Sequence, residues 1–264
     1  MATSEARKNG GIMETVRTIL WALIIAGIFR TLFFQPFWIP SGSMKDTLLI
    51  GDFLFVNKMA YGYSRVSCPF ALCPIQGRIL GREPQRGDVV VFRHPTRGDD
   101  FIKRLIGLPG DRIRMQDGIL VLNGQPVPQT PAGTFAEPQA PQGPQGSLPC
   151  PAGIRAPTPD GLCIAERAIE TLPGGISHDV LNLTDAGPGD NTPEFTVPEG
   201  HYFFMGDNRD NSGDSRWPAS VGGVGMVPAE YLIGRADRIM FSSAGRSLLY
   251  FWTWRPDRFL RAVN

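Results

Sequence analysis

Three short segments carry residue types that together could perform nucleophilic catalysis. Ser41 and Ser43 lie in the turn-forming run Pro-Ser-Gly-Ser-Met at 40–44. Lys103 interrupts an apolar, strand-like run at 101–107, where a charged amine is costly unless its charge is paired or lost. A polar loop at 206–216 follows an apolar run. Taken singly, these features are more typical of an ordinary loop, a lysine at a strand edge and a solvated turn.

Other catalytic chemistries fit this chain poorly. Its three histidines are scattered and no Gly-x-Ser-x-Gly segment is present, so a Ser-His-Asp hydrolase is disfavoured. The four cysteines include no Cys-x-x-Cys pair and have no histidine nearby, which disfavours a zinc site. We therefore expect no metal and no cofactor, and a serine nucleophile that relies on a base other than histidine.

Together the three segments resemble those of the bacterial type I signal peptidases, which are membrane-bound serine proteases that remove signal peptides from exported proteins. The matching stretches are PSGSM (40–44), GDVVVF (87–92), FIKRLIGLPGD (101–111) and GDNRDNSGDSR (206–216), and they occur in the family's order. The resemblance covers roughly residues 15–115 and 195–240, whereas the proline-rich middle of the chain matches little.

The resemblance implies a serine–lysine dyad, with Ser43 as the nucleophile and Lys103 as the general base. Lysine can accept the serine proton only when it is neutral, although its ordinary pKa is about 10.4. Burial in an apolar setting lowers a lysine pKa by up to ~3–5 units. The dyad therefore requires a buried Lys103.

The same resemblance assigns supporting roles. Ser212 would orient the Lys103 amine, and the Ser41 hydroxyl with the Ser43 backbone N–H would stabilise the oxyanion. Asp214 and Arg216 would form a structural ion pair. Shallow pockets for the small residues of Ala-x-Ala substrates, bound as an added strand, would be lined by Ile39, Pro40, Met44, Leu48, Phe101 and Ile102.

One departure from the family pattern follows the Ser-Met pair at 43–44. Asp46 stands where many members have proline, and Lys45 before it is also polar. We expect these two residues to alter the local turn without touching the dyad.

Short strands joined by turns must position these segments. The chain has 31 glycines and 24 prolines, which disfavours helical bundles and doubly wound α/β folds. Hairpin turns are expected at Asp117-Gly118 and Asn123-Gly124. Together with the resemblance, this predicts an all-β, mostly antiparallel catalytic domain of coiled sheets. Its expected strands include 48–56, 88–92, 112–115, 201–205 and 232–241.

An apolar run near the N-terminus predicts one transmembrane helix over residues 16–35. A cleavable signal peptide is the alternative, but no small-x-small site follows the run. Arg7, Lys8 and Arg17 precede the span, so the positive-inside rule keeps residues 1–15 in the cytoplasm. The rest would then lie outside the cytoplasm, anchored in the bacterial inner membrane by a single span.

Beyond the anchor we expect four regions. Residues 36–111 and 200–245 form the two parts of the catalytic core, and residues 112–199 form an inserted β region. The insert holds a proline-rich loop at 125–160, which we expect to be poorly ordered because it has few large apolar residues; a proline-rich ligand for a partner is the alternative. The tail at 246–264, rich in aromatic and basic residues, either docks on the domain or contacts the membrane interface.

All four cysteines lie beyond the span, which agrees with an oxidising compartment. Their order suggests bridges 68–73 and 150–163, although four cysteines permit three connectivities and free thiols remain the alternative. The candidates are Cys68, Cys73, Cys150 and Cys163.

The expected partners are preproteins that carry signal peptides, and membrane lipid. A formal net charge of +1 gives no basic field for nucleic acid, and we expect a monomer. Three other functions compete: a dedicated relative that matures one conjugation or pilus protein, a self-cleaving Ser-Lys repressor, and an inactive β module that binds partners through a sheet edge. The anchor argues against the repressor, and retention of Ser43, Lys103 and Ser212 argues against the inactive module.

Overall fold

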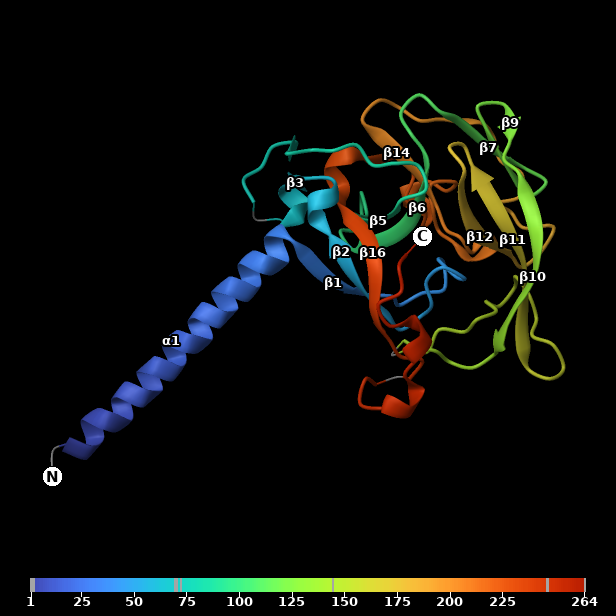
Figure 1. Cartoon of the computed structure of the whole chain (residues 1–264). Helices are drawn as coiled ribbons and strands as arrows, with labels where there is room; N and C mark the ends of the chain where they lie inside the picture. Colours follow the sequence, from blue (N-terminus) through green and yellow to red (C-terminus); the bar gives the residue numbers. More distant parts are fainter. Residues whose placement is uncertain (1–2, 69–70, 72, 144, 246, 264) are drawn as a thin grey trace.

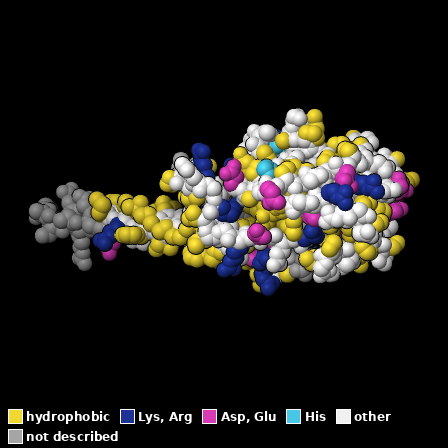
Figure 2. All heavy atoms as spheres, turned by 90° about the horizontal axis from the view of Figure 1, so that it is seen from above, with side chains coloured by type: hydrophobic (Ala, Val, Ile, Leu, Met, Phe, Trp, Pro, Cys, Tyr) yellow, Lys and Arg dark blue, Asp and Glu magenta, His cyan; other side chains and the backbone are white. Residues whose placement is uncertain are grey.

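A long N-terminal helix projects from a β domain (Figure 1). The computed structural model describes residues 3–68, 71, 73–143, 145–245 and 247–263. Helix α1 runs over Thr3–Leu32 and ends before the expected end of the span at residue 35. Its apolar part is Gly11–Leu32, whose 22 residues extend for roughly 33 Å, enough to cross a bilayer. Hydrophobic side chains cover this part and almost all are exposed (Figure 2), so the helix fits a membrane-anchored protein.

The main sheet has seven strands in the order β1-β2-β16-β5-β6-β14-β15, and its described pairs are all antiparallel. Its strands are β1 (Phe34–Trp38), β2 (Asp52–Asn57), β5 (Val89–Arg93), β6 (Asp100–Gly107), β14 (His201–Met205), β15 (Val227–Pro228) and β16 (Leu232–Ser242). Register shifts interrupt β16 against both of its neighbours. Because such bulges increase the local twist, the sheet curls.

Smaller sheets complete the domain. Three strands form the inserted sheet β10-β11-β12: Gln129–Pro138, Leu162–Leu172 and Ile176–Asn182. Four form β13-β7-β8-β9: Phe195–Thr196, Arg112–Gln116, Ile119–Leu122 and Gln125–Pro126. β3 (Tyr63–Ser64) pairs with β4 (Arg78–Ile79). Short 3₁₀ turns lie at Lys58–Ala60, Arg65–Ser67, Arg209–Asn211, Ala219–Val221, Ala229–Tyr231, Phe251–Thr253 and Pro256–Arg258.

The expected hairpin turns join strands of the β13-β7-β8-β9 sheet. Both residues of Asp117-Gly118 have positive φ, at 49° and 74°, as do Asn123-Gly124 at 53° and 80°. This is the backbone that a two-residue hairpin turn of type I′ requires. The predicted fold class is confirmed: the domain is mostly antiparallel β with a curled sheet.

The proline-rich stretch at 125–160 is more regular than its composition predicts. It contains β9 and β10, and β10 pairs with β11 along most of its length. Since most β10 side chains are at least partly exposed, backbone pairing rather than a large core supplies this order. The expectation of a poorly ordered loop is therefore wrong for Gln129–Pro138.

The structure pairs the cysteines locally. Cys68 is bonded to Cys73, and Cys150 to Cys163. The second bridge lies in a small apolar cluster with residues of β11 and β12, and it joins the end of the proline-rich stretch to the inserted sheet. A bridge of this kind limits the conformations of the unfolded chain.

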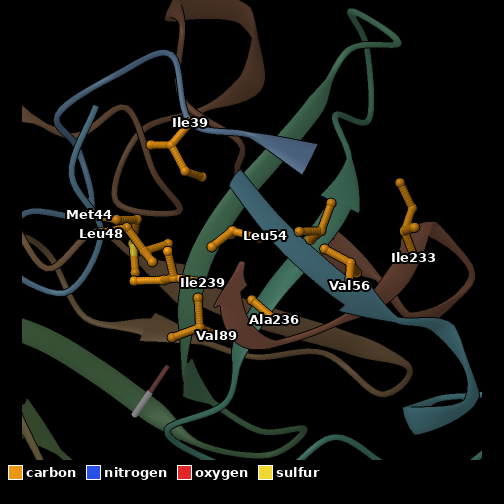
Figure 3. Close-up of a cluster of buried hydrophobic side chains, with 10 residues drawn as sticks. Ile39, Met44, Leu48, Leu54, Val56, Val89, Ile233, Ala236 and Ile239 are labelled. Atoms are coloured by element: carbon orange, nitrogen blue, oxygen red, sulfur yellow. The ribbon is translucent and has the colours of Figure 1, made fainter. Parts of the chain in front are cut away.

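One buried cluster underlies the strands next to the serine-bearing turn (Figure 3). Leu54 and Val56 of β2 pack with Val89 of β5 and with Ile239 of β16. Met44, from the turn itself, reaches into the same cluster and is fully buried. The turn is therefore attached directly to the core.

The C-terminal tail docks on the domain in part. Arg258 forms a buried ion pair with Asp52 at the start of β2, and Trp254 packs edge-on against Phe241 of β16 at 4.7 Å. By contrast, Trp252 is 69% exposed, within an exposed apolar group at 248–252.

Candidate active site

The turn that carries Ser43 lies between β1 and β2. Backbone N–H groups of Lys45 and Leu48 donate to the carbonyl oxygens of Gly42 and Met44, at 3.2 and 2.7 Å. Met44 and Leu48 point into the core, which leaves Ser41 exposed on the outer side. Core packing therefore fixes the position of the Ser43 backbone.

Lys103 faces this turn from β6. It pairs with Val90 of β5, and its Nζ lies 2.5 Å from Ser43 Oγ. Lys103 is 3% exposed and Ser43 is 7% exposed, so water has little access to the contact. The structure thus brings together two residues that are 60 positions apart in the sequence.

Burial controls the charge of the Lys103 amine. Desolvation lowers the pKa of Lys103 to about 8 from its ordinary value of 10.5, although the carboxylates of Asp214 and Asp207 raise it. The Phe101 ring lies 5.7 Å from Nζ on the same strand. A substantial fraction of the amine is therefore neutral in mildly alkaline solution, as a general base requires.

The loop at 206–216 holds the turn from the opposite side. The backbone N–H of Asn208 donates to the Ser43 carbonyl oxygen, and its side-chain Nδ2 donates to the Gly42 carbonyl oxygen, both at 3.1 Å. Gly206 lies so close that a Cβ atom there would sit 2.5 Å from the Ser43 carbonyl oxygen. Only glycine fits this position without moving the backbone.

Two buried ion pairs brace the loop. Arg216 donates to both carboxylate oxygens of Asp214 at 2.9 Å, and the Gly206 backbone N–H donates to the same carboxylate. Arg104, next to Lys103, donates to both oxygens of Asp207 at 2.8 Å. Although burial raises the pKa of Asp214, the Arg216 guanidinium holds it below its usual value. Both carboxylates are therefore charged and fully paired.

Ser41 and Ser212 lie near the dyad with different contacts. Ser41 Oγ is 3.5 Å from Ser43 Oγ. Ser212 Oγ is buried and helps to lower the pKa of Asp214, and the expected bond to the Lys103 amine is not present in this arrangement. Within the loop it lies close to Gly206, which contacts the Ser43 backbone.

The six residues expected to line substrate pockets fall into two groups. Ile39, Met44 and Leu48 are at most 2% exposed and belong to the core cluster. Pro40, Phe101 and Ile102 are partly exposed. Of these three, Ile102 packs against the same core cluster, whereas Phe101 packs against the cluster that contains Phe92 and Phe204.

One edge of β6 is open next to the dyad. β6 pairs with β5 from Asp100 through Arg104, but its described pairs with β14 begin only at Arg104. Among the described residues, no strand pairs with the other edge of β6 at 100–103. Unpaired backbone groups of this kind can accept an extended peptide as an added strand.

Several site residues were not identified from the sequence. Arg104 directly follows Lys103 in the sequence, and Asp207 directly follows Gly206. This adjacency to residues of the matching segments was the signal that could have identified them. Asn208 was missed because one of its two contacts is made by its own backbone N–H and both go to backbone carbonyl oxygens of the turn. Contacts of this kind depend little on residue type. In the described part of the chain, no group of three His, Cys, Asp or Glu side chains is placed to hold a metal ion.

Comparisons with known proteins identify the family of the chain. A sequence profile described as "Signal peptidase, peptidase S26" matches residues 12–241. A signal peptidase I of Rickettsia typhi is 37% identical over 246 residues, covering 92% of this chain and 85% of the relative. A signal peptidase I of Rickettsia massiliae is 38% identical over 234 residues, covering 86% and 78%. A solved signal peptidase I from Enterococcus faecalis is 24% identical, with a TM-score of 0.30, covering 58% of this chain and 97% of that one. The extent of the profile and of the relatives shows that the chain belongs to the signal peptidase family, peptidase S26.

Proposed function

We propose that this peptidase cleaves signal peptides through a Ser43–Lys103 dyad. The observation that carries the proposal is the 2.5 Å contact between Lys103 Nζ and Ser43 Oγ, made by a buried lysine whose pKa is lowered to about 8. When the amine is neutral, the Ser43 hydroxyl donates to it, which activates the oxygen as a nucleophile. Membership of the family supports a signal peptide as the substrate.

The reaction proceeds in two halves. Ser43 Oγ bonds to the scissile carbonyl carbon while Lys103 takes its proton, which gives a tetrahedral oxyanion. The peptide C–N bond then breaks, Lys103 returns the proton to the leaving amine, and an acyl-enzyme remains. Water, deprotonated by Lys103, attacks this ester and releases the signal peptide with regeneration of Ser43.

Three groups would support these steps. The Ser41 hydroxyl and the Ser43 backbone N–H stabilise the oxyanion, and the exposed position of Ser41 beside Ser43 supports this role. Ser212 orients the Lys103 amine after a small rotation. The Asp214–Arg216 pair keeps the loop rigid around them.

The substrate lies extended along the open edge of β6 at 100–103. This placement brings its backbone to the dyad, because Lys103 is the last residue of that edge. Small residues of an Ala-x-Ala type site occupy shallow apolar subsites formed by Phe101, Ile102 and Pro40. Ile39, Met44 and Leu48 form the floor beneath them.

The enzyme acts as a monomer at the bacterial inner membrane. The apolar part of α1 spans the bilayer once, with the N-terminus in the cytoplasm and the catalytic domain outside it. The exposed apolar group at 248–252 contacts membrane lipid at the interface. The two disulfides suit this oxidising side.

The direct test is cleavage of a purified precursor with an Ala-x-Ala site, in lipid vesicles, by the wild type and by Ser43→Ala and Lys103→Met. We expect a single cut after the small-x-small site and a loss of about 10⁴-fold or more in either variant. Ser177→Ala, an exposed serine on β12, is the matched control and should retain full activity.

Activity that survives Ser43→Ala would show that another group is the nucleophile. A wild type that cleaves one pilus or conjugation precursor and no general precursor would show a dedicated enzyme.

A further inference from the structure

The two polar residues that follow the nucleophile turn are joined to the inserted sheet. Lys45 is 1% exposed, and its Nζ donates to Glu137 Oε1 at the end of β10. Gln142 completes a closed triangle, because its Nε2 donates to Glu137 Oε2 at 2.7 Å and its Oε1 accepts from Lys45 Nζ at 3.4 Å. A buried charge arranged in this way is fully paired.

The Lys45 side chain also packs on the residue before the nucleophile. A Cβ atom placed on Gly42 would lie 3.2 Å from Lys45 Cε and 3.3 Å from Cδ. The aliphatic part of Lys45 therefore folds back over Gly42, directly beside Ser43. The Lys45 side chain is therefore in contact with the backbone that carries the nucleophile.

Further contacts from the inserted region flank the same turn. Arg167 of β11 pairs with Asp46 at 3.3 Å, and its guanidinium also donates to the Ala132 carbonyl oxygen in β10. On the N-terminal side of the nucleophile, the Pro40 carbonyl oxygen accepts a hydrogen bond from Ser147 Oγ at 3.4 Å. The inserted region thus contacts the turn on both sides of residues 41–43.

We propose that Lys45 is a positioning residue, whose ion pair with Glu137 fastens the nucleophile turn to the inserted sheet and holds Ser43 Oγ against Lys103. The inference rests on the proposed Ser43–Lys103 dyad. It assigns a role in catalysis to the inserted sheet, which supplies neither member of the dyad.

The test measures kcat, KM and melting temperature for full-length protein in vesicles. Lys45→Met keeps the aliphatic stem and removes the charge, which leaves Glu137 unpaired at a largely buried site. We expect kcat to fall by about 10- to 100-fold, since small displacements of reacting groups have effects of this size. KM should change by less than about threefold, because no proposed substrate contact is altered.

A double variant separates positioning from a simple loss of stability. In Lys45→Met/Glu137→Leu neither charge remains, and replacing a buried pair by apolar residues is often neutral for stability. We expect its melting temperature to recover while its kcat stays low, because the ion pair that joins the turn to the inserted sheet is still missing. Glu137→Gln keeps the hydrogen-bonding shape without the charge and should lose less kcat than Lys45→Met.

Lys58→Met is the matched control. Lys58 is also 1% exposed, but its Nζ donates to the Ser67 carbonyl oxygen, in a 3₁₀ segment that carries no residue of the proposed site. This variant should lower the melting temperature and leave kcat unchanged.

Three results would overturn the proposal. They are an unchanged kcat in Lys45→Met, a wild-type kcat in the double variant, or an equal kcat loss in Lys58→Met. Failure of the dyad itself would give a different result, because Ser43→Ala would then remain active. Ser43→Ala and Lys45→Met are therefore measured side by side.

Discussion

At the scale of single residues, the site depends on a lysine that is kept close to neutrality. Lys103 is buried on β6 and its amine meets the Ser43 hydroxyl, while the nearest carboxylates, Asp207 and Asp214, are each bound by an arginine. Because those carboxylates are neutralised by Arg104 and Arg216, they raise the Lys103 pKa less than free carboxylates would. Desolvation therefore prevails, and the pKa falls to about 8.

The pH dependence of cleavage follows from this pKa. Below about pH 8 the Lys103 amine is protonated and cannot accept the serine proton, so log kcat/KM should rise with unit slope. Above that value the amine is neutral and kcat/KM should level off. Steady-state cleavage of a precursor between pH 6 and 10 gives the profile. A flat profile across this range contradicts the role of Lys103 as the base.

At the scale of elements, three pieces of chain meet at one point. The turn between β1 and β2 supplies Ser43, β6 supplies Lys103, and the loop after β14 supplies Asn208 and Gly206. The loop approaches the turn so closely that its first residue has no room for a side chain, since a Cβ atom on Gly206 would also lie 2.3 Å from Ser212 Oγ. Packing between elements thus determines the separation of the reacting atoms.

Gly206→Ala tests this close approach. The added methyl must displace the Ser43 carbonyl or the loop itself, so we expect kcat to fall by about 100-fold or more with little change in KM. Gly81→Ala is the matched control, because its Cβ would lie 3.4 Å from Arg78 side-chain atoms and 4.0 Å from the Tyr61 carbonyl oxygen, which are ordinary contact distances. Comparable activity of the two variants would show that the loop adjusts freely and that the contact does not set the geometry.

At the scale of the whole molecule, the protein consists of an exposed apolar helix, which fits a membrane anchor, and a β domain, which holds the candidate active site. The side chains of α1 from Gly11 to Arg30 are exposed, so the helix gains no stability from the domain and needs an apolar surrounding of its own. Three basic residues precede the apolar core of the span, whereas no Lys or Arg occurs between Thr31 and Met44. This asymmetry favours one orientation in the membrane.

The orientation can be measured by protease protection. In spheroplasts, an added protease should digest the β domain, whereas in inverted inner-membrane vesicles the domain should be protected until detergent is added. Moving Arg7, Lys8 and Arg17 to positions after Phe34 should weaken or reverse this bias. Digestion of the domain in intact inverted vesicles would contradict the proposed topology.

The sequence alone determined the residues of the dyad as candidates, the anchor, the hairpin turns and the fold class. The anchor and the turns are local features, because an uninterrupted apolar run and Asp-Gly or Asn-Gly dipeptides have the same physical preferences in any surroundings. The dyad candidates and the coiled-sheet fold came instead from the resemblance of several segments, in order, to the signal peptidase family. Strand limits were less accurate: β2 begins at Asp52, since residues 48–50 belong to the turn that enters the core.

Only the tertiary structure decided which distant residues meet. The order of β10 comes from pairing with β11, whose residues follow it in the chain after the intervening loop, and the composition of β10 gave no sign of this pairing. Lys45 and Glu137 are 92 positions apart, and nothing in either sequence neighbourhood predicts their ion pair. Burial, which sets the charge of Lys103, likewise depends on how the turn, the sheet and the loop pack together, and this packing is a property of the whole chain.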